Sequence, residues 1–451
     1  MFAISPLFNF AFCHLGRKLP VYRQERHICL SGKSKTGSSP EGDKDQSGLL
    51  ITGARQTGKT SSIEAFGRER YEAMVKIDFV EQPRAVEVIS EAQNLSDLIM
   101  RITALAERPL VPESTLLFFD EVQRCADAIT WMRYLAEDDR FDVIYSGSML
   151  GVEAYDFRSL PVGTIDIEEM FPLDFEEFCW SQGTDPMLWD AVKECFTARE
   201  PVPDFLHEMF LDLWLRYVLI GGMPEAAQVF ADTHDTQLMR ARQRGILDTY
   251  RADITRYVKD RVRARQIKTI FDAVPSQLNK ESKRFIISGA TDGKRFSRIA
   301  SDFDWLADAG VVTPVHRATE ATFLWGSEER SYFKLYQSDV GLLFATFPST
   351  AVEQLLARSE DMNLGAVFEN AVAQELRAHG HERLYYFNKR GVGEVDFMID
   401  AAGAPYVVPI EVKSGKSSKR HAALDALLGV KNYKLEGAIV LHEETWSKKA
   451  P

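Results

Sequence analysis

The sequence has few cysteines, and their spacing is not that of a disulfide framework or a zinc site. Only five of the 451 residues are cysteine, an odd number, and no two of them form a CxxC pair. Disulfide-rich domains and structural zinc sites need cysteines in pairs at short spacings. We therefore expect reduced thiols and a cytoplasmic location.

Long apolar segments are also missing. No apolar run approaches the roughly 20 residues that a membrane-spanning helix needs, so no membrane partner is expected. The apolar start of the chain, Met1 to Cys13, lacks the basic region and the small-residue cleavage site of a signal peptide. Two interpretations of this start stay open, namely a strand that docks on a domain and an over-extended start of the reading frame.

Positive charge is in deficit, because 54 Lys and Arg residues stand against 66 Asp and Glu and give a net charge of −12. Such a chain does not coat nucleic acid uniformly, since repulsion opposes contact outside a local basic patch. One patch lies at residues 256–268 (RYVKDRVRARQIK), with six basic residues and one acid. It is either a contact for DNA or RNA phosphates or a helix that packs against an acidic neighbour.

The composition is that of a globular protein, with 45% hydrophobic and 27% charged residues. The length indicates about three domains. After residue 48, short apolar runs alternate with helical patterns, which predicts an α/β domain with a parallel sheet. The predicted strands are Leu49–Thr52, Val75–Phe79, Leu116–Phe119 and Asp142–Ser146.

A phosphate-binding loop follows the first predicted strand. Residues 53–60 read GARQTGKT and match the pattern GxxxxGK[ST]. In this pattern the backbone N–H groups and the helix N-terminus face the phosphates, Lys59 reaches the β and γ phosphates, and Thr60 holds Mg²⁺. The motif predicts ATP and Mg²⁺ as cofactors. The residues expected to contact the nucleotide are Gly53, Ala54, Arg55, Gln56, Thr57, Gly58, Lys59, Thr60 and Ser61.

A second motif, Leu116 to Glu121 (LLFFDE), places two carboxylates at the end of an apolar strand. Open α/β sheets bind ligands at that end of their strands. We expect Asp120 to hold Mg²⁺ through water and Glu121 to orient the attacking water. Ser148, after the fourth strand, is either a sensor of the γ-phosphate or part of a plain turn. Arg158 is the nearest candidate for an arginine finger.

Further motifs follow in a fixed order: PLDFEEF at 172–178, GGMPE at 221–225 and FKLYQSDVGLL at 333–343. With the two motifs above, the series resembles the prokaryotic family of AAA-type ATPases with a C-terminal domain of unknown function, over about residues 49–416. The resemblance implies an α/β P-loop NTPase core with an inserted strand, a helical and winged-helix-like middle and a restriction-endonuclease-like end. The chain departs from the family at Thr164, where members often carry a basic residue.

The domains expected from the patterns and the resemblance are an N-terminal extension with a flexible loop (1–48), the ATPase core (49–170), a helical lid region (171–255), a winged-helix-like domain (256–350) and a restriction-endonuclease-like domain (351–451). The sequence leaves homo-oligomerisation open.

Carboxylates gather in the last of these regions. Apolar residues alternate over 394–400 and again over 408–412, which predicts two strands. A tight turn at Ala402-Gly403 would pair Val395 with Ile410 and place Glu394 opposite Glu411. Facing carboxylates destabilise a strand pair, and a divalent cation would relieve the repulsion.

Glu369, on a predicted helix over 365–376, is a candidate for one more carboxylate at this site. The resemblance to restriction endonucleases implies that Asp396 and Glu411 hold Mg²⁺ and that Lys413 orients water or stabilises the phosphate. The alternative is an acidic hairpin face that Lys413, Lys416 and Arg420 neutralise. Two functions therefore remain, an ATPase coupled to a nuclease and a nucleotide-dependent switch whose inactive C-terminal domain docks a partner.

Overall fold

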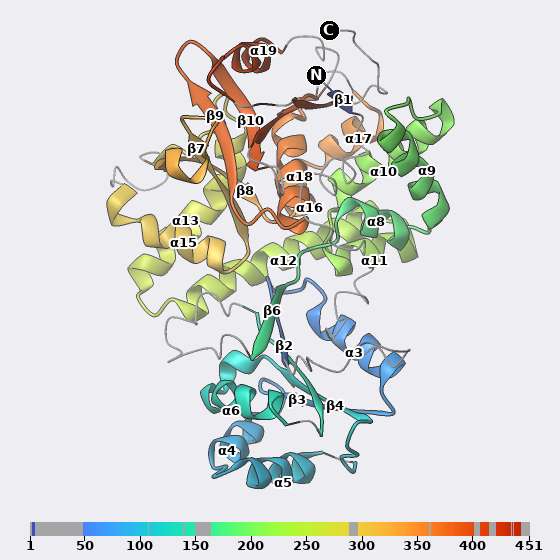
Figure 1. Cartoon of the computed structure of the whole chain (residues 1–451), viewed down its shortest axis with the longest axis vertical. Helices are drawn as coiled ribbons and strands as arrows, with labels where there is room; N and C mark the ends of the chain where they lie inside the picture. Colours follow the sequence, from blue (N-terminus) through green and yellow to red (C-terminus); the bar gives the residue numbers. More distant parts are fainter. Residues whose placement is uncertain are drawn as a thin grey trace. The chain divides into compact units, whose positions relative to one another are not determined.

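The structure is a computed structural model of the chain, shown in Figure 1. It describes residues 2–4, 48–106, 108–138, 140–148, 164–287, 296–359, 362–400, 406–414, 421–433, 435 and 437–442. The flexible loop expected before residue 48, Arg158, Lys416 and Arg420 lie outside the described residues. The chain divides into two compact units, Val21–Phe171 and the remainder, Met1–Pro20 with Pro172–Pro451.

The first unit contains a five-stranded sheet in the order β3-β4-β5-β2-β6, and all neighbouring strands in it are parallel (Figure 1). Strand β5 lies between β2, which leads into the phosphate loop, and β4, which ends at Asp120. This confirms the α/β fold with an inserted strand. The strands are β2 (Gly48–Thr52), β3 (Ala73–Asp78), β4 (Thr115–Asp120), β5 (Asp142–Ser146) and β6 (Ile165–Glu169).

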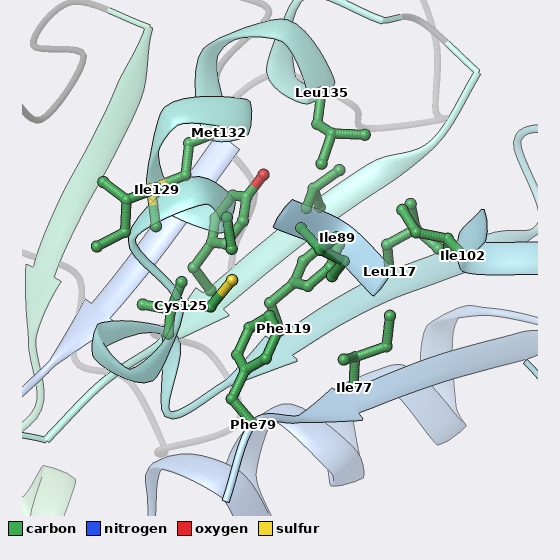
Figure 2. Packing of buried hydrophobic residues seen from close by; sticks show 14 of the residues in the cluster. Ile77, Phe79, Ile89, Ile102, Leu117, Phe119, Cys125, Ile129, Met132 and Leu135 are labelled. Atoms are coloured by element: carbon green, nitrogen blue, oxygen red, sulfur yellow. The ribbon is translucent and has the colours of Figure 1, made fainter. Parts of the chain in front are cut away.

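Strand β4 is buried along its whole length, as expected for a central strand of a parallel sheet. Figure 2 shows Leu117 and Phe119 of this strand among side chains of the covering helices, including Ile129 and Met132. The ring of Phe119 stacks on Tyr145 with centroids 5.3 Å apart. This packing holds β4 in place and so determines the position of Asp120 at its end. The helices of this unit are α3 (Lys59–Arg70), α4 (Pro83–Ser90), α5 (Leu95–Leu105), η1 (Val122–Arg124) and α6 (Ala126–Ala136).

Residues 175–257 of the second unit form mainly helices, as expected for the helical region at 171–255. An aromatic core holds them together, in which the ring of Phe175 lies 5.2 Å from Trp214 and 5.7 Å from Trp189. The helices are α8 (Phe175–Ser181), α9 (Pro186–Ala198), α10 (Asp204–Ile220), α11 (Pro224–Thr233), α12 (Thr236–Tyr257), α13 (Arg261–Leu278), η3 (Phe296–Arg298) and α15 (Ala300–Asp308). In the described part of the chain, no helix is both long and apolar enough to cross a membrane.

A seven-stranded mixed sheet completes this unit, in the order β1-β12-β11-β10-β9-β7-β8. Its strands are β1 (Phe2–Ile4), β7 (Val312–Ala318), β8 (Glu328–Gln337), β9 (Leu384–Lys389), β10 (Gly393–Asp400), β11 (Val407–Val412) and β12 (Ile439–Leu441). Strand β1 pairs with β12, as the docking-strand interpretation of the chain start expects. The remaining helices are η4 (Trp325–Ser327), α16 (Val340–Phe344), α17 (Thr350–Leu356), α18 (Gly365–Ala378) and α19 (Ala422–Leu428).

The sheet runs across the border expected near residue 350. Strand β7, from the segment expected to be winged-helix-like, pairs in parallel with β9 of the C-terminal segment, with Val315 opposite Leu384. Residues from both segments thus form one sheet inside one compact unit. No division between compact units falls at residue 350.

The register of the C-terminal hairpin differs from the expected one by two residues. Phe397, and not Val395, lies opposite Ile410, and Ile399 lies opposite Val408. The faces on which the side chains lie are unchanged, because a strand repeats every two residues. A shift by two residues is compatible with the alternating pattern, because alternation fixes the faces of the strands and not their register. Asp396, rather than Glu394, is therefore the carboxylate next to Glu411.

Candidate functional site

The phosphate loop needs glycine at two positions. Gly53 has φ 134°, and a Cβ atom there would lie 2.2 Å from the carbonyl oxygen of Met170. Gly58 has φ 92° and caps the N-terminus of α3, so the helix begins at Lys59. A residue other than glycine would be strained in either of these backbone conformations. The loop therefore leads into the N-terminus of α3, and a helix N-terminus presents backbone N–H groups to an anion.

Lys59 lies against this loop and is 7% exposed. Its Nζ donates to the carbonyl oxygens of Gly53 at 3.0 Å and Ala54 at 2.6 Å, and Thr57 Oγ1 donates to the latter carbonyl at 3.0 Å. Burial lowers the pKa of Lys59 to about 8, against the opposing effect of Glu121 and Asp120. Among the described residues no carboxylate forms an ion pair with this buried ammonium group, which would gain from a phosphate.

Asp120 joins the two motifs. Thr60 Oγ1 donates to Asp120 Oδ2 at 2.8 Å, and Ser146 Oγ donates to Asp120 Oδ1. Lys76 Nζ lies 3.5 Å from the same carboxylate and helps to compensate its burial. The oxygen atoms of Thr60 and Asp120, hard ligands on adjacent elements, fit Mg²⁺. The sequence analysis did not identify Lys76 as part of this site. Its position in β3, the strand that pairs with β4, could have indicated it.

Glu121 is held by a small network. Its backbone is left-handed, with φ 52°, and its carboxylate accepts hydrogen bonds from Gln123 Nε2 at 2.5 Å and Ser148 Oγ at 3.0 Å. Arg55 Nε lies 3.4 Å from the same hydroxyl. Ser148 therefore contacts Glu121, a position that the sequence alone did not predict. Gln123 was also missed, although it follows Glu121 by only two residues.

The other residues expected at the phosphate loop differ in how far they are exposed to solvent. Ala54 is buried, whereas Gln56, with φ 65°, and Ser61 in the first turn of α3 are exposed. At Thr164 the structure describes a backbone contact, because the N–H of Gly48 donates to its carbonyl oxygen at 3.1 Å. This contact supplies no substitute for the basic residue that the family often carries.

The expected C-terminal carboxylates also come together. Glu369 on α18 accepts hydrogen bonds from Tyr336 Oη at 2.7 Å and from Lys283. Lys334 Nζ lies 2.9 Å from Glu394, 3.4 Å from Glu369 and 3.7 Å from Asp396. We call these residues, with Glu411 and Lys413, the carboxylate cluster.

Glu411 and Asp396 complete the cluster from β11 and β10. Lys413 Nζ lies 2.5 Å from Glu411 Oε1, and the N–H of Val412 donates to Asp396 Oδ2 at 2.8 Å. Burial and the charge of Glu369 raise the pKa of Asp396, with Lys334 opposing. Burial also tends to raise the pKa of Glu369, but Lys334 and Lys283 hold it below its usual value. Among the described residues, no group of three or more His, Cys, Asp and Glu is arranged to hold a metal ion.

The basic stretch at 256–268 divides into two parts. Arg263 Nε lies 2.8 Å from the buried carboxylate of Asp302. For this residue the structure agrees with the interpretation of the stretch as a helix that packs against an acidic neighbour. Arg261, Arg265 and Lys268 are exposed on α13. These three side chains remain candidates for contact with phosphates.

Curated relatives and solved structures resemble this chain at low identity. An uncharacterized protein of Mycobacterium tuberculosis and one of Mycobacterium bovis are each 24% identical over 400 residues, 84% of this chain and 74% of theirs. A Walker-type ATPase of Pyrococcus abyssi is 17% identical with a TM-score of 0.40, over 66% of this chain and 90% of its own. An Aeropyrum pernix Orc1 protein in complex with DNA is 13% identical with a TM-score of 0.27, over 69% of this chain and 87% of its own.

Three family models match successive parts of the chain. Residues 45–179 match the AAA domain, residues 211–353 the domain of unknown function DUF8612, and residues 364–448 the domain of unknown function DUF4143. The first match contains the phosphate loop, Asp120 and Glu121, and the last contains four of the clustered carboxylates, Glu369, Glu394, Asp396 and Glu411. The chain therefore combines an AAA domain of the P-loop ATPase type, over residues 45–179, with a DUF4143 domain over residues 364–448.

Proposed function

We propose that the first unit binds Mg²⁺·ATP and hydrolyses it to ADP and phosphate. The observation that carries the proposal is the convergence of Thr60, Asp120 and Glu121 beside the phosphate loop, with 2.8 Å between Thr60 Oγ1 and Asp120 Oδ2. Phosphoryl transfer needs little covalent chemistry from a protein. It depends on positioning and on charge placed around the phosphates.

Each residue has a distinct part in the proposed reaction. The N–H groups at the start of α3 bind the phosphates, and Lys59 neutralises charge that develops on the γ-phosphate. Thr60 and Asp120 would hold Mg²⁺, which would supply positive charge to the phosphates. Glu121 orients the attacking water, and Gln123 and Ser148 determine where its carboxylate lies.

The proposal is tested first at Asp120. We expect Asp120→Asn to reduce Mg²⁺-dependent phosphate release by about 100-fold, because one ligand charge is lost from the metal site. Phosphate release by the whole chain is measured over a series of Mg²⁺ concentrations. Asp127→Asn, an exposed carboxylate on α6 of the same unit, is the control. A parent protein without Mg²⁺-dependent ATP turnover would refute the proposed function.

The structure supports a second candidate activity, binding of DNA or RNA through Arg261, Arg265 and Lys268. We expect Arg261→Glu with Arg265→Glu to weaken nucleic-acid binding and to reduce the salt slope of log K by about two, one for each lost phosphate contact. Fluorescence anisotropy with single- and double-stranded DNA and RNA at several salt concentrations measures this. Arg68→Glu with Arg70→Glu, an equal change of charge on exposed residues of α3, should leave the slope unchanged. An equal slope in parent and variant would contradict the assignment.

A further inference from the structure

The carboxylate cluster contains cations of its own. Four carboxyl groups (Glu369, Glu394, Asp396 and Glu411) lie with three lysines (Lys283, Lys334 and Lys413). If all seven groups are ionised, the cluster has a net charge of only −1. A site built to bind a divalent cation normally keeps more negative charge than that, because the cation is the main source of neutralisation. In this cluster the three lysines already neutralise most of the negative charge of the carboxylates.

Lys334 occupies the centre of this arrangement. It is completely buried, and its Nζ lies between 2.9 and 3.7 Å from carboxylates on α18 and β10. An unpaired ammonium group is costly in a protein interior, so these carboxylates are what keep it charged. Lys334 stands on β8, in the part of the chain that matches DUF8612, whereas the carboxylates lie in the part that matches DUF4143.

The carboxylate oxygens that a metal would need are largely in use. Glu369 Oε1 is bound to Lys283, and Glu369 Oε2 accepts from Tyr336 and faces Lys334. Asp396 Oδ2 accepts from the N–H of Val412, and Asp396 Oδ1 faces Lys334. Within the described residues, Glu411 Oε2 is a buried oxygen of the cluster without a hydrogen-bond partner. One such oxygen is fewer than a protein site for Mg²⁺ or Mn²⁺ uses, and the residues therefore do not fit the divalent cation that the restriction-endonuclease resemblance implies.

We infer that Lys334 stands where a divalent cation would otherwise stand, so that most of the negative charge of the carboxylate cluster is compensated without metal. The C-terminal part of the second unit then keeps its clustered carboxylates together without a divalent cation, and it does not carry out metal-dependent phosphodiester cleavage. This inference does not depend on ATP hydrolysis, because every residue in it belongs to the second unit.

The test compares thermal unfolding of the whole chain in EDTA and in Mn²⁺, without nucleotide. Every variant carries Thr60→Ala, which removes a ligand from the phosphate-loop site. With Lys334 in place, Mn²⁺ should leave the unfolding temperature unchanged.

Lys334→Met removes the internal cation and keeps an apolar stem of similar length. This variant should be less stable in EDTA and should bind Mn²⁺ at least about tenfold more tightly than the Lys334 protein, since the carboxylates lose their counter-charge. Lys389→Met, at an exposed ion pair with Glu320, should show no response to Mn²⁺.

A second variant keeps the inference testable if Lys334→Met does not fold. Lys334→Met combined with Glu369→Gln removes one charge of each sign, and this protein should fold and be insensitive to Mn²⁺. The inference is overturned if Mn²⁺ stabilises the Lys334 protein and Asp396→Asn abolishes that stabilisation. It is equally overturned if Lys334→Met folds and Mn²⁺ affects it no more than it affects the Lys389→Met control. Calorimetric titration with Mn²⁺ alone gives the affinities for both comparisons.

Discussion

Replacing Glu121 with glutamine is expected to leave ATP bound and to slow its hydrolysis by about 100-fold or more, because the carboxylate that orients the attacking water loses its charge. Glutamine has nearly the same shape, and Ser148 Oγ, 3.0 Å from the carboxylate, can still donate to its amide oxygen. The effect should therefore fall on turnover and not on nucleotide affinity. Single-turnover phosphate release and calorimetric titration with ATP separate the two quantities.

The control for this variant is Glu137→Gln, which neutralises an exposed glutamate that pairs with Arg133 at 2.8 Å on the surface of α6. Surface pairs of this kind contribute little to stability, so this protein should hydrolyse ATP at the parental rate. If Glu121→Gln also turned over at the parental rate, another group would have to orient the water, and the assignment of Glu121 would be wrong.

Replacing Lys59 with alanine should reduce ATP affinity by about 10- to 100-fold, as expected for loss of a charge-assisted contact to phosphate. The variant should remain folded, because the hydrogen bonds that Lys59 Nζ makes within the described part of the chain go to two carbonyl oxygens of the loop, those of Gly53 and Ala54. Calorimetric titration with ATP in Mg²⁺ measures the loss. An unchanged affinity would exclude Lys59 as a phosphate ligand.

Lys59 also predicts a pH dependence whose sign can be derived. Burial lowers its pKa to about 8, and bound phosphates favour the charged ammonium form and so raise it again. Above pH 8, ATP binding should therefore take up a proton, and the affinity should fall as the pH increases. Titrations at pH 9 in two buffers of different ionisation enthalpy report the uptake. Lys59→Arg keeps its charge at this pH and should take up less, whereas equal uptake by both proteins would assign the proton to another group.

The ATPase core could be predicted from sequence because its signals are local. The four predicted strands contain short apolar runs, and the observed β5 (Asp142–Ser146) has the predicted bounds. Strand β6, which reads IDIEE and carries three acids, was not predicted. The phosphate loop and the strand that ends at Asp120 are each contiguous in sequence. The partners of Glu121 were harder to predict, because the contact with Ser148 depends on how β4 and β5 lie side by side.

The C-terminal site shows what sequence patterns leave undetermined. Alternation identified the faces of β10 and β11 but not their register, because any shift by two residues keeps the same faces. Nothing in the sequence indicated that Lys334 belongs to the cluster, because it lies 62 positions before Asp396. The two residues come together through the pairing of strands β8, β7, β9 and β10. Arg263 looked like part of a basic patch, because its partner Asp302 lies 39 positions later in the chain and gives no local signal.

The continuous seven-stranded sheet has a consequence for how this protein can be divided and recombined in evolution. The border between the DUF8612 and DUF4143 matches falls between β8 and β9, inside one sheet. A polypeptide cut there would expose β9 as an unpaired edge, a template for aggregation, and would separate buried carboxylates from Lys334. The two segments therefore form one folding unit, and a gene fusion that carried only the second segment would lack the partner strands β7 and β8.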